Sequence, residues 1–188
     1  MPTGSQRPFA ERAGALFVGS FGHAPNLDAV EWLLGEIWPL VLEAEPELRL
    51  TVVGSDPPAW LSATERPGVD VAGEVPDVDV FLDRALVSVA PLRFGAGVKG
   101  KVLASMARGV PVVGSPIALE GIPAAHERDV LAAEGAEETA AAVVRLAGDA
   151  ELWERLSADA TALVAERFSP EAARTALELA LSPELARA

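Results

Sequence analysis

The sequence contains no cysteine, which excludes disulfide bonds, thiolate metal sites and cysteine nucleophiles. Lysine is nearly absent as well, since Lys99 and Lys101 are the only lysines in a chain of formal net charge −13. This acidic balance argues against nucleic-acid partners and against docking on anionic lipid, because both need a positive surface. No apolar run approaches the ~20 residues of a membrane span. We therefore expect a cytoplasmic protein with no nucleic-acid partner and no membrane contact.

The chain has 188 residues, of which 50% are hydrophobic, so it is long enough to bury a real core. Its first stretch, MPTGSQRPFAERAG, lacks the charged-then-apolar layout of a signal peptide. We predict a flexible leader over residues 1–13. A single domain that includes the C-terminal helices is predicted over residues 14–188.

Short apolar runs alternate with helical patterns along this domain. Strands are predicted at 15–20, 48–55, 69–73, 86–92, 110–115 and 129–133. Helices are predicted from Asn26 onward and at 78–85, 98–108, 136–147, 150–166 and 170–181. Strands that alternate with helices and are apolar on both faces indicate a parallel sheet covered on two sides. The predicted fold class is therefore α/β, a Rossmann-like parallel sheet sandwiched by helices.

Several residues predict where these helices begin and end. Asn26 is expected as an N-cap, with Asp28 in the first turn, where the helix dipole favours a negative charge. Pro39 lies inside the same pattern and should kink the helix or end its regular part. Gly109 is expected just past the end of the 98–108 helix. The last helix should begin at SPE, a serine cap followed by Pro170.

One loop gathers cations and glycines in an otherwise acidic chain. Within nine residues it contains Arg93, Gly95, Gly97, Lys99, Gly100 and Lys101. The loop matches G-x-G-x-x-G, with Glu120 further on, but a dinucleotide fingerprint belongs to the first strand–helix turn of its unit, and this is about the fourth. It also matches G-x-x-x-x-G-K, but Val102 stands where a nucleotide triphosphatase needs a magnesium-binding hydroxyl. Neither motif is in its required context.

The two motifs share a physical basis that this loop keeps. Glycines let backbone N–H groups approach an anion closely, and the helix that follows offers the positive end of its dipole. Arg93, Lys99 and Lys101 add full positive charges, so the loop suits a phosphate or diphosphate. The alternative is a loop of solvated surface cations whose glycines serve only to adopt positive φ.

Longer segments carry a family resemblance. FVGSFGHAPN, LTVVGSDPP, VDVAGEVPD, PLRFGAGVKGKVLASMARGVPVV and ALEGI follow one another in the order and spacing of the C-terminal half of GT-B glycosyltransferases. The chain most resembles the retaining group 1 type, also called family 4, over residues 14–180. The resemblance implies one half of a GT-B fold that binds a nucleotide-sugar donor. It also implies that no metal is needed, because cationic side chains and a helix N-terminus stabilise the departing nucleoside diphosphate.

The resemblance also implies roles for particular residues. Arg93 and Lys99 would be the catalytic cations that hold the diphosphate, with Lys101 beside them. The remaining donor-binding positions are backbone or loop positions. They are Gly19, Ser20 and Phe21 near the phosphates, Gly73, Glu74 and Val75 flanking the nucleobase, Gly95 and Gly97 in the cationic loop, and Leu119, Glu120 and Gly121 near the sugar.

The chain departs from the family pattern at two places. Ala104 stands where the family usually has a glutamate that grips the ribose, and Ala96 stands at the partner acidic position. The loop after the first strand has His23 where many relatives carry Arg and Lys. The acceptor-binding half is also missing from this chain, so we expect it as a partner domain in cis or in trans.

Other functions stay open on the sequence. A catalytically degenerate GT-B-like binding or scaffold module would fit Ala104 and the missing half. A sugar-nucleotide epimerase would need its own acid and base in the cleft. A nicotinamide oxidoreductase would need a full fingerprint at FVGSFG, where only Gly19 and Gly22 are present. A receiver-type signalling domain would need acidic residues after the first strand, and ALFVGS has none.

Overall fold

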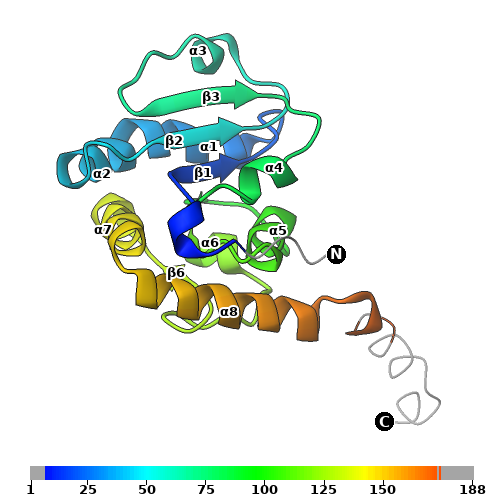
Figure 1. Cartoon of the computed structure of the whole chain (residues 1–188). Helices are drawn as coiled ribbons and strands as arrows, with labels where there is room; N and C mark the ends of the chain where they lie inside the picture. The colour runs from blue at the N-terminus through cyan, green and yellow to red at the C-terminus, as the bar shows by residue number, and fades with distance from the viewer. Residues whose placement is uncertain (1–6, 173, 175–188) are drawn as a thin grey trace.

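Six parallel strands form one sheet in the order β3-β2-β1-β4-β5-β6 in the computed structural model, which describes residues 7–172 and 174 (Figure 1). The strands are β1 (Ala15–Val18), β2 (Leu50–Val53), β3 (Val69–Gly73), β4 (Val87–Ala90), β5 (Val112–Gly114) and β6 (Leu131–Ala132). Each lies inside a segment predicted to be a strand. The Rossmann-like α/β fold class is confirmed.

Helices cover both faces of the sheet. One face carries α1 (Ala24–Trp32), the π-helical turn η2 (Leu33–Ile37), α2 (Trp38–Ala44) and α7 (Gly135–Gly148), which contact one another. The other face carries α5 (Gly100–Ala107) and α8 (Ala150–Arg167), which contact each other. The 3-10 turn η1 (Phe9–Glu11) packs against α8 on this face. Short helices fill loops: α3 (Ala59–Ser62), α4 (Asp79–Leu82) and α6 (Pro116–Leu119). Of these three helices of four residues each, α4 lies in a predicted helix, whereas α3 and α6 were not predicted.

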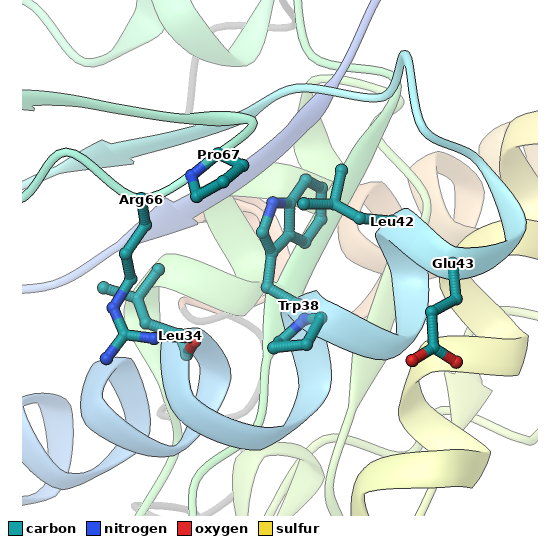
Figure 2. Close-up of a pocket in the computed structure, with 7 residues that line it drawn as sticks. Leu34, Trp38, Leu42, Glu43, Arg66 and Pro67 are labelled. Carbon is teal, nitrogen blue, oxygen red and sulfur yellow. Dashed lines mark hydrogen bonds between the residues drawn. The ribbon is translucent and has the colours of Figure 1, made fainter.

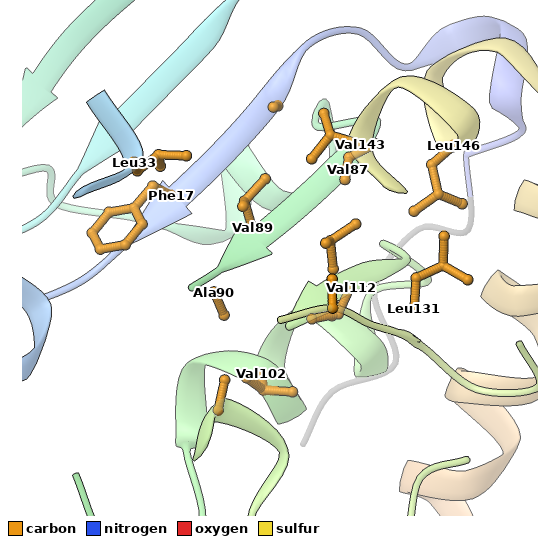
Figure 3. Packing of buried hydrophobic residues seen from close by; sticks show 14 of the residues in the cluster. Phe17, Leu33, Val87, Val89, Ala90, Val102, Val112, Leu131, Val143 and Leu146 are labelled. Carbon is orange, nitrogen blue, oxygen red and sulfur yellow. The ribbon is translucent and has the colours of Figure 1, made fainter. Parts of the chain in front are cut away.

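The core lies between the sheet and its helices. Phe17 of β1 lies beside Leu33, and Val87 of β4 lies beside Val143 of α7 (Figure 3). Residues on the opposite side of β1 and β2, such as Leu16, form a smaller apolar cluster with α4. Alternate residues of one strand thus enter different clusters, as expected for a sheet covered on both faces.

The start of α1 differs from the expectation. The helix begins at Ala24 after His23, with Pro25 in its first turn, so Asn26 is not its N-cap and Asp28 lies beyond the first turn. Proline favours the first helical turn because its missing N–H has no partner there anyway. The Asn26 side chain instead donates from Nδ2 to the carbonyl of Ser20 at 2.8 Å.

The predicted end of the regular helix at Pro39 does not occur, because the helix is interrupted before Pro39, at η2, and resumes in α2. Pro39 lies in the first turn of α2 and follows the π-helical turn, in which the Trp38 N–H donates to the carbonyl of Leu33. Pro39 has no N–H to donate to the carbonyl four residues before it, and in a regular α-helix its ring would clash with that carbonyl. The wider π-helical turn relieves this clash.

The other two helix signals are confirmed. Gly109 has φ +64° directly after the Arg108 C-cap of α5, the conformation that glycine adopts most easily. The hydroxyl of Ser169 accepts from the N–H of Ala172 at 3.1 Å, with Pro170 between them. The remainder of the predicted 170–181 helix lies largely outside the described residues.

The predicted leader ends earlier than residue 13. Phe9 packs edge-on against Trp153 of α8, with ring centroids 5.9 Å apart. The Arg12 guanidinium is buried and donates to the carbonyls of Leu82, Ala85 and Arg108 at 2.8–3.1 Å. Residues 8–13 are therefore part of the folded domain, whereas residues 1–6 lie outside the described part of the chain.

Candidate functional site

A pocket of about 390 Å³ opens at the carboxyl ends of β1, β2 and β3. We call it the strand-end pocket. Its lining residues come from the loops after these strands, with contributions from α1 and α5: Val18, Gly19, Ser20, Asn26, Val53, Gly54, Ser55, Glu74, Val75, Val78 and Lys101. Five of the predicted donor-binding residues are among them, namely Gly19, Ser20, Glu74, Val75 and Lys101. In open α/β sheets this edge is where ligands bind.

Glycine backbone holds the loops of the pocket together. The Gly19 N–H donates to Val53 at 3.0 Å, and the Gly54 N–H donates to Gly73 at 2.8 Å. A Cβ on Gly54 would lie 1.6 Å from the carbonyl oxygen of Gly19. Only glycine permits this approach, so Gly54 sets the distance between the first two loops.

Lys101 is the cation that enters the strand-end pocket. Its Nζ donates to Asn26 Oδ1 at 2.7 Å and lies 4.8 Å from the centre of the Phe17 ring. Burial, together with the nearby charge of Lys99, lowers the pKa of Lys101 to about 8. At neutral pH the pocket therefore contains a poorly solvated cation, which an anion would stabilise.

Arg93 and Lys99 lie on the cationic loop outside the pocket lining, and each already has an acidic partner. Arg93 Nε donates to Asp28 Oδ2 at 2.8 Å, and its guanidinium lies 5.3 Å from the Trp32 ring. The hydrogen bond to Asp28 raises the pKa of Arg93. Lys99 Nζ lies 3.4 Å from Glu120 Oε2 and also bonds the carbonyl of Gly97.

The turn after α6 lies against the cationic loop. A Cβ on Gly121 would come within 2.8 Å of Val98 Cγ2, and Glu120 reaches Lys99. Gly95 and Gly97 have φ values of +135° and +75°. These positive φ values by themselves favour glycine at both positions.

Phe21 and Leu119 pack into the interior. Phe21 is 4% exposed and stacks on Phe17 with ring centroids 6.2 Å apart. Its backbone still serves the site, because the Phe21 N–H donates to Ser55 at 2.9 Å. Leu119 is partly buried against the main core and would touch a Cβ on Gly114.

Ala104 of α5 packs against the same small apolar cluster as Val18, Val75 and Val78, which line the pocket, but Ala104 itself is not a lining residue. A glutamate at this position would bring a carboxylate next to these apolar residues, so the cluster is less polar than the family pattern implies. Ala96 is exposed on the cationic loop.

Sequence reasoning missed Asn26 and Ser55 as parts of the pocket. Ser55 Oγ donates to Ser20 Oγ at 3.0 Å, and Asn26 orients Lys101. A signal for Ser55 was present, because β1 and β2 both run into the same V-G-S triplet. Neighbouring parallel strands with the same ending place the two serines side by side.

Among the described residues no group of three or more His, Asp or Glu side chains is arranged to hold a metal ion. No helix in the same part of the chain is both long and apolar enough to cross a membrane.

A parallel six-stranded α/β domain with its pocket at the strand ends and a cationic loop before α5 is one Rossmann-like half of a GT-B protein. The family model for glycosyl transferases group 1 matches residues 12–149. The chain belongs to this family.

Known proteins of similar sequence or structure are larger or are domains of larger proteins. A curated relative, an uncharacterized 44.6 kDa protein in the cps region of Klebsiella pneumoniae, is 26% identical over 127 residues, which cover 63% of this chain and 33% of the relative. A TarM mutant from S. aureus in complex with Fondaparinux, alpha-GlcNAc-glycerol and UDP has a TM-score of 0.76 at 13% identity, covering 95% of this chain and 37% of that one.

The C-terminal domain of a glycosyl transferase group 1 family protein, LpcC from Francisella tularensis, has a TM-score of 0.69 at 12% identity. That match covers 89% of this chain and 95% of the domain. The chain thus spans about a third of the first two proteins and nearly all of an isolated C-terminal domain.

Proposed function

We propose that this chain is the nucleotide-sugar donor-binding domain of a retaining, metal-independent glycosyltransferase. The observation that carries the proposal is the strand-end pocket, in which partly buried Lys101, with the charge of Lys99 nearby, meets the glycine loops after β1 and β2. The UDP in the TarM mutant complex supports a nucleoside diphosphate as the ligand class. In this proposal no metal ion takes part, because the three cations supply the positive charge.

Each part of the donor has a place in this proposal. The nucleobase lies against Gly73, Glu74 and Val75, at the end of β3. The diphosphate lies across the cationic loop and the N-terminus of α5, where backbone N–H groups and the helix dipole favour an anion. The sugar lies toward residues 119–121.

Arg93 and Lys99 act on the leaving group. When the bond between the sugar and the diphosphate breaks, its electron pair goes to the diphosphate oxygen, and positive charge nearby stabilises it. Both cations must first leave Asp28 and Glu120. In each pair one side chain is about half exposed, Arg93 in one and Glu120 in the other, so water weakens both pairs and a diphosphate, with its larger negative charge, can displace the carboxylates.

Sugar transfer needs the acceptor-binding half as a partner, because donor and acceptor have to be held together in a closed cleft. We expect the isolated chain to bind donor without transferring sugar. A second candidate is a GT-B-like module that has lost catalysis. Ala104 favours it, because the glutamate that grips the ribose in the family pattern is absent at this position.

Calorimetric titration with UDP, GDP and ADP tests the proposal. We expect saturable binding of one nucleotide, weakened at least tenfold in Lys99→Ala and in Lys101→Met. Arg49→Ala is the matched control, because it also removes a cation from an exposed ion pair, with Asp70 at the other end of the strands. A folded chain that binds none of the three nucleotides would contradict the proposal and support the degenerate module.

A further inference from the structure

A second cavity of about 300 Å³ lies between the η2–α2 segment and the loop that leads into β3 (Figure 2). Leu34, Trp38, Pro39, Leu42, Glu43, Arg66 and Pro67 line it. We call it the Trp38 pocket. Because Arg66 and Pro67 precede β3, this cavity lies at the amino ends of the strands, and it shares no lining residue with the strand-end pocket.

The wall of this pocket contains a buried donor without an acceptor. Trp38 is 2% exposed, and its Nε1 is the one buried side-chain polar atom in the described part of the chain that lacks a hydrogen-bond partner. By contrast, Trp153 Nε1 donates to the carbonyl of Leu86 at 2.6 Å. Buried indole N–H groups usually find an acceptor, so an unpartnered one in a cavity wall suggests a ligand that provides it.

The atoms around Trp38 Nε1 explain why the protein provides no acceptor. In Figure 2 the indole nitrogen is turned toward Pro67, which offers a ring rather than an oxygen. A Cβ on the next residue, Gly68, would lie 3.2 Å from Nε1 and 2.9 Å from Leu42 Cδ2. The loop therefore closes over the indole edge with small residues, so a ligand acceptor reaches the N–H only when Pro67 and Gly68 move aside.

The two ends of the pocket have opposite charge. Arg66 donates to the carbonyl of Leu34 at 2.8 Å, which holds its guanidinium at one end, and Glu43 lies at the other end (Figure 2). Neither side chain forms an ion pair within the described residues. An anionic group is therefore attracted to the Arg66 end and repelled from the Glu43 end.

The π-helical turn beside the pocket has a local cause and does not by itself indicate a ligand. Such turns are frequent at functional sites, but Pro39 already accounts for this one. A ligand is indicated by the combination of an apolar cavity, an unpartnered indole N–H and Arg66, which uses one guanidinium nitrogen to bond Leu34 and has further N–H donors.

We propose that the Trp38 pocket binds a small carboxylate with an apolar body, such as an arylalkyl or branched alkyl acid. The apolar body packs on the Trp38 indole, Leu34 and Leu42. The carboxylate lies at the Arg66 end and accepts the indole N–H. The volume is at the lower limit of ligand cavities, so the ligand is smaller than a nucleotide.

Heteronuclear NMR of the full ¹⁵N-labelled chain tests this proposal, because each of the four tryptophans gives a separate indole signal. Contacts to the Gly68 protons identify the Trp38 signal. The probes are 3-phenylpropionate and 4-methylpentanoate, compared with 3-phenylpropanamide, which keeps the body without the charge, and acetate, which keeps the charge without the body.

We expect both acids to shift the Trp38 N–H signal saturably downfield, while the Trp153 signal stays in place. The amide should bind about tenfold more weakly, and acetate should have no effect. Arg66→Gln should reduce binding of the acids to that of the amide. Arg84→Gln removes the same charge from an exposed site elsewhere and should leave binding unchanged.

Three results would overturn the proposal. The first is a Trp38 signal that none of the acids shifts. The second is equal shifts at Trp38 and Trp153, which indicate unspecific association. The third is amide binding as tight as acid binding, or equal binding in Arg66→Gln. Nucleotide titrations are separate, because the two pockets share no residue, so this proposal and the donor-site proposal fail independently.

Discussion

At the scale of single residues, Lys101 links the strand-end pocket to the stability of the fold. Its pKa in the folded chain is about 8, against 10.5 for the free side chain, because the site solvates the ammonium group poorly. Between these values the unfolded chain holds a proton that the folded chain lacks. The free energy of unfolding should therefore rise as pH increases from about 8 toward 10.5, by up to about 3 kcal/mol.

The composition makes this pH window unusually clear. The chain has neither cysteine nor tyrosine, so the lysines are the main side chains that titrate there. Urea unfolding at pH 7.5, 8.5, 9.5 and 10 measures the effect. Lys101→Met should remove the increase, and Arg84→Gln should keep it. An increase that persists in Lys101→Met would show that another group causes it.

Gly54 is the second residue on which the pocket depends. Gly54→Ala should destabilise the domain by at least about 3 kcal/mol, because the new Cβ would overlap the Gly19 carbonyl oxygen at 1.6 Å. Gly35→Ala is the matched control. No atom lies within 4 Å of its added Cβ, so it should stabilise the domain by about 0.5–1 kcal/mol. Urea unfolding of both variants measures these changes in stability. Equal changes in Gly54→Ala and Gly35→Ala would contradict the close approach of Gly54 to the Gly19 carbonyl.

At the scale of elements, Arg12, the C-cap of η1, links the start of the chain to α4, α5 and α8. Arg12→Met should lower the free energy of unfolding by about 3 kcal/mol, because it leaves the buried carbonyls of Leu82 and Ala85 without their donor. Burial lowers the pKa of Arg12, and the nearby carboxylate of Asp83 opposes this only in part. The carbonyl bonds and the Trp153 ring, 5.3 Å from the guanidinium carbon, replace the water that the side chain loses.

Chemical denaturation of Arg12→Met and Arg12→Lys measures this contribution. Lysine keeps the charge but cannot reach several carbonyls from one planar group, so it should lose nearly as much stability. Arg84→Met, an exposed site, is expected to change stability by less than about 0.5 kcal/mol. If Arg12→Lys unfolds with the same free energy as the unchanged chain, the positive charge at position 12 and not the geometry of the guanidinium group accounts for the stabilisation.

The same scale shows where sequence patterns were sufficient. The six strands and the long helices lie where apolar periodicity predicted them, because a buried strand or an amphipathic helix has to repeat its apolar positions with the period of its backbone. The N-cap at Asn26 was wrong because Pro25 moves the helix start back to Ala24. The short helix α3 was missed because its four residues contain about one turn, whereas the equally short α4 lies in a longer predicted segment, 78–85.

At the scale of the whole molecule, ligand binding should stabilise the fold through mass action. If one nucleotide binds as proposed, a concentration a hundred times its Kd adds about 2.7 kcal/mol to the free energy of unfolding. For a domain of this size that raises Tm by about 5–10 °C. Thermal unfolding with UDP, GDP and ADP measures it. Lys99→Ala should show a much smaller shift in Tm, whereas Arg49→Ala should show the same shift as the unchanged chain. A Tm that none of the three nucleotides raises would contradict the donor site.

What the sequence alone determined is the order of the elements, the fold class and the family, together with the loop in which the cations gather. These depend on neighbours along the chain, such as the glycines and cations within residues 93–101. Which cation faces a pocket was decided only by the tertiary structure. Lys101 turns inward to Asn26, while Arg93 turns outward to Asp28, 65 residues away.

The Trp38 pocket and the packing of Arg12 likewise depend on tertiary structure alone. Arg66 reaches Leu34 across 32 residues, and Arg12 reaches Arg108 across 96. Local sequence propensity cannot predict such contacts, because they form only when the sheet brings distant loops together. The strand periods thus determined where the loops lie, and three-dimensional packing determined which of their side chains meet.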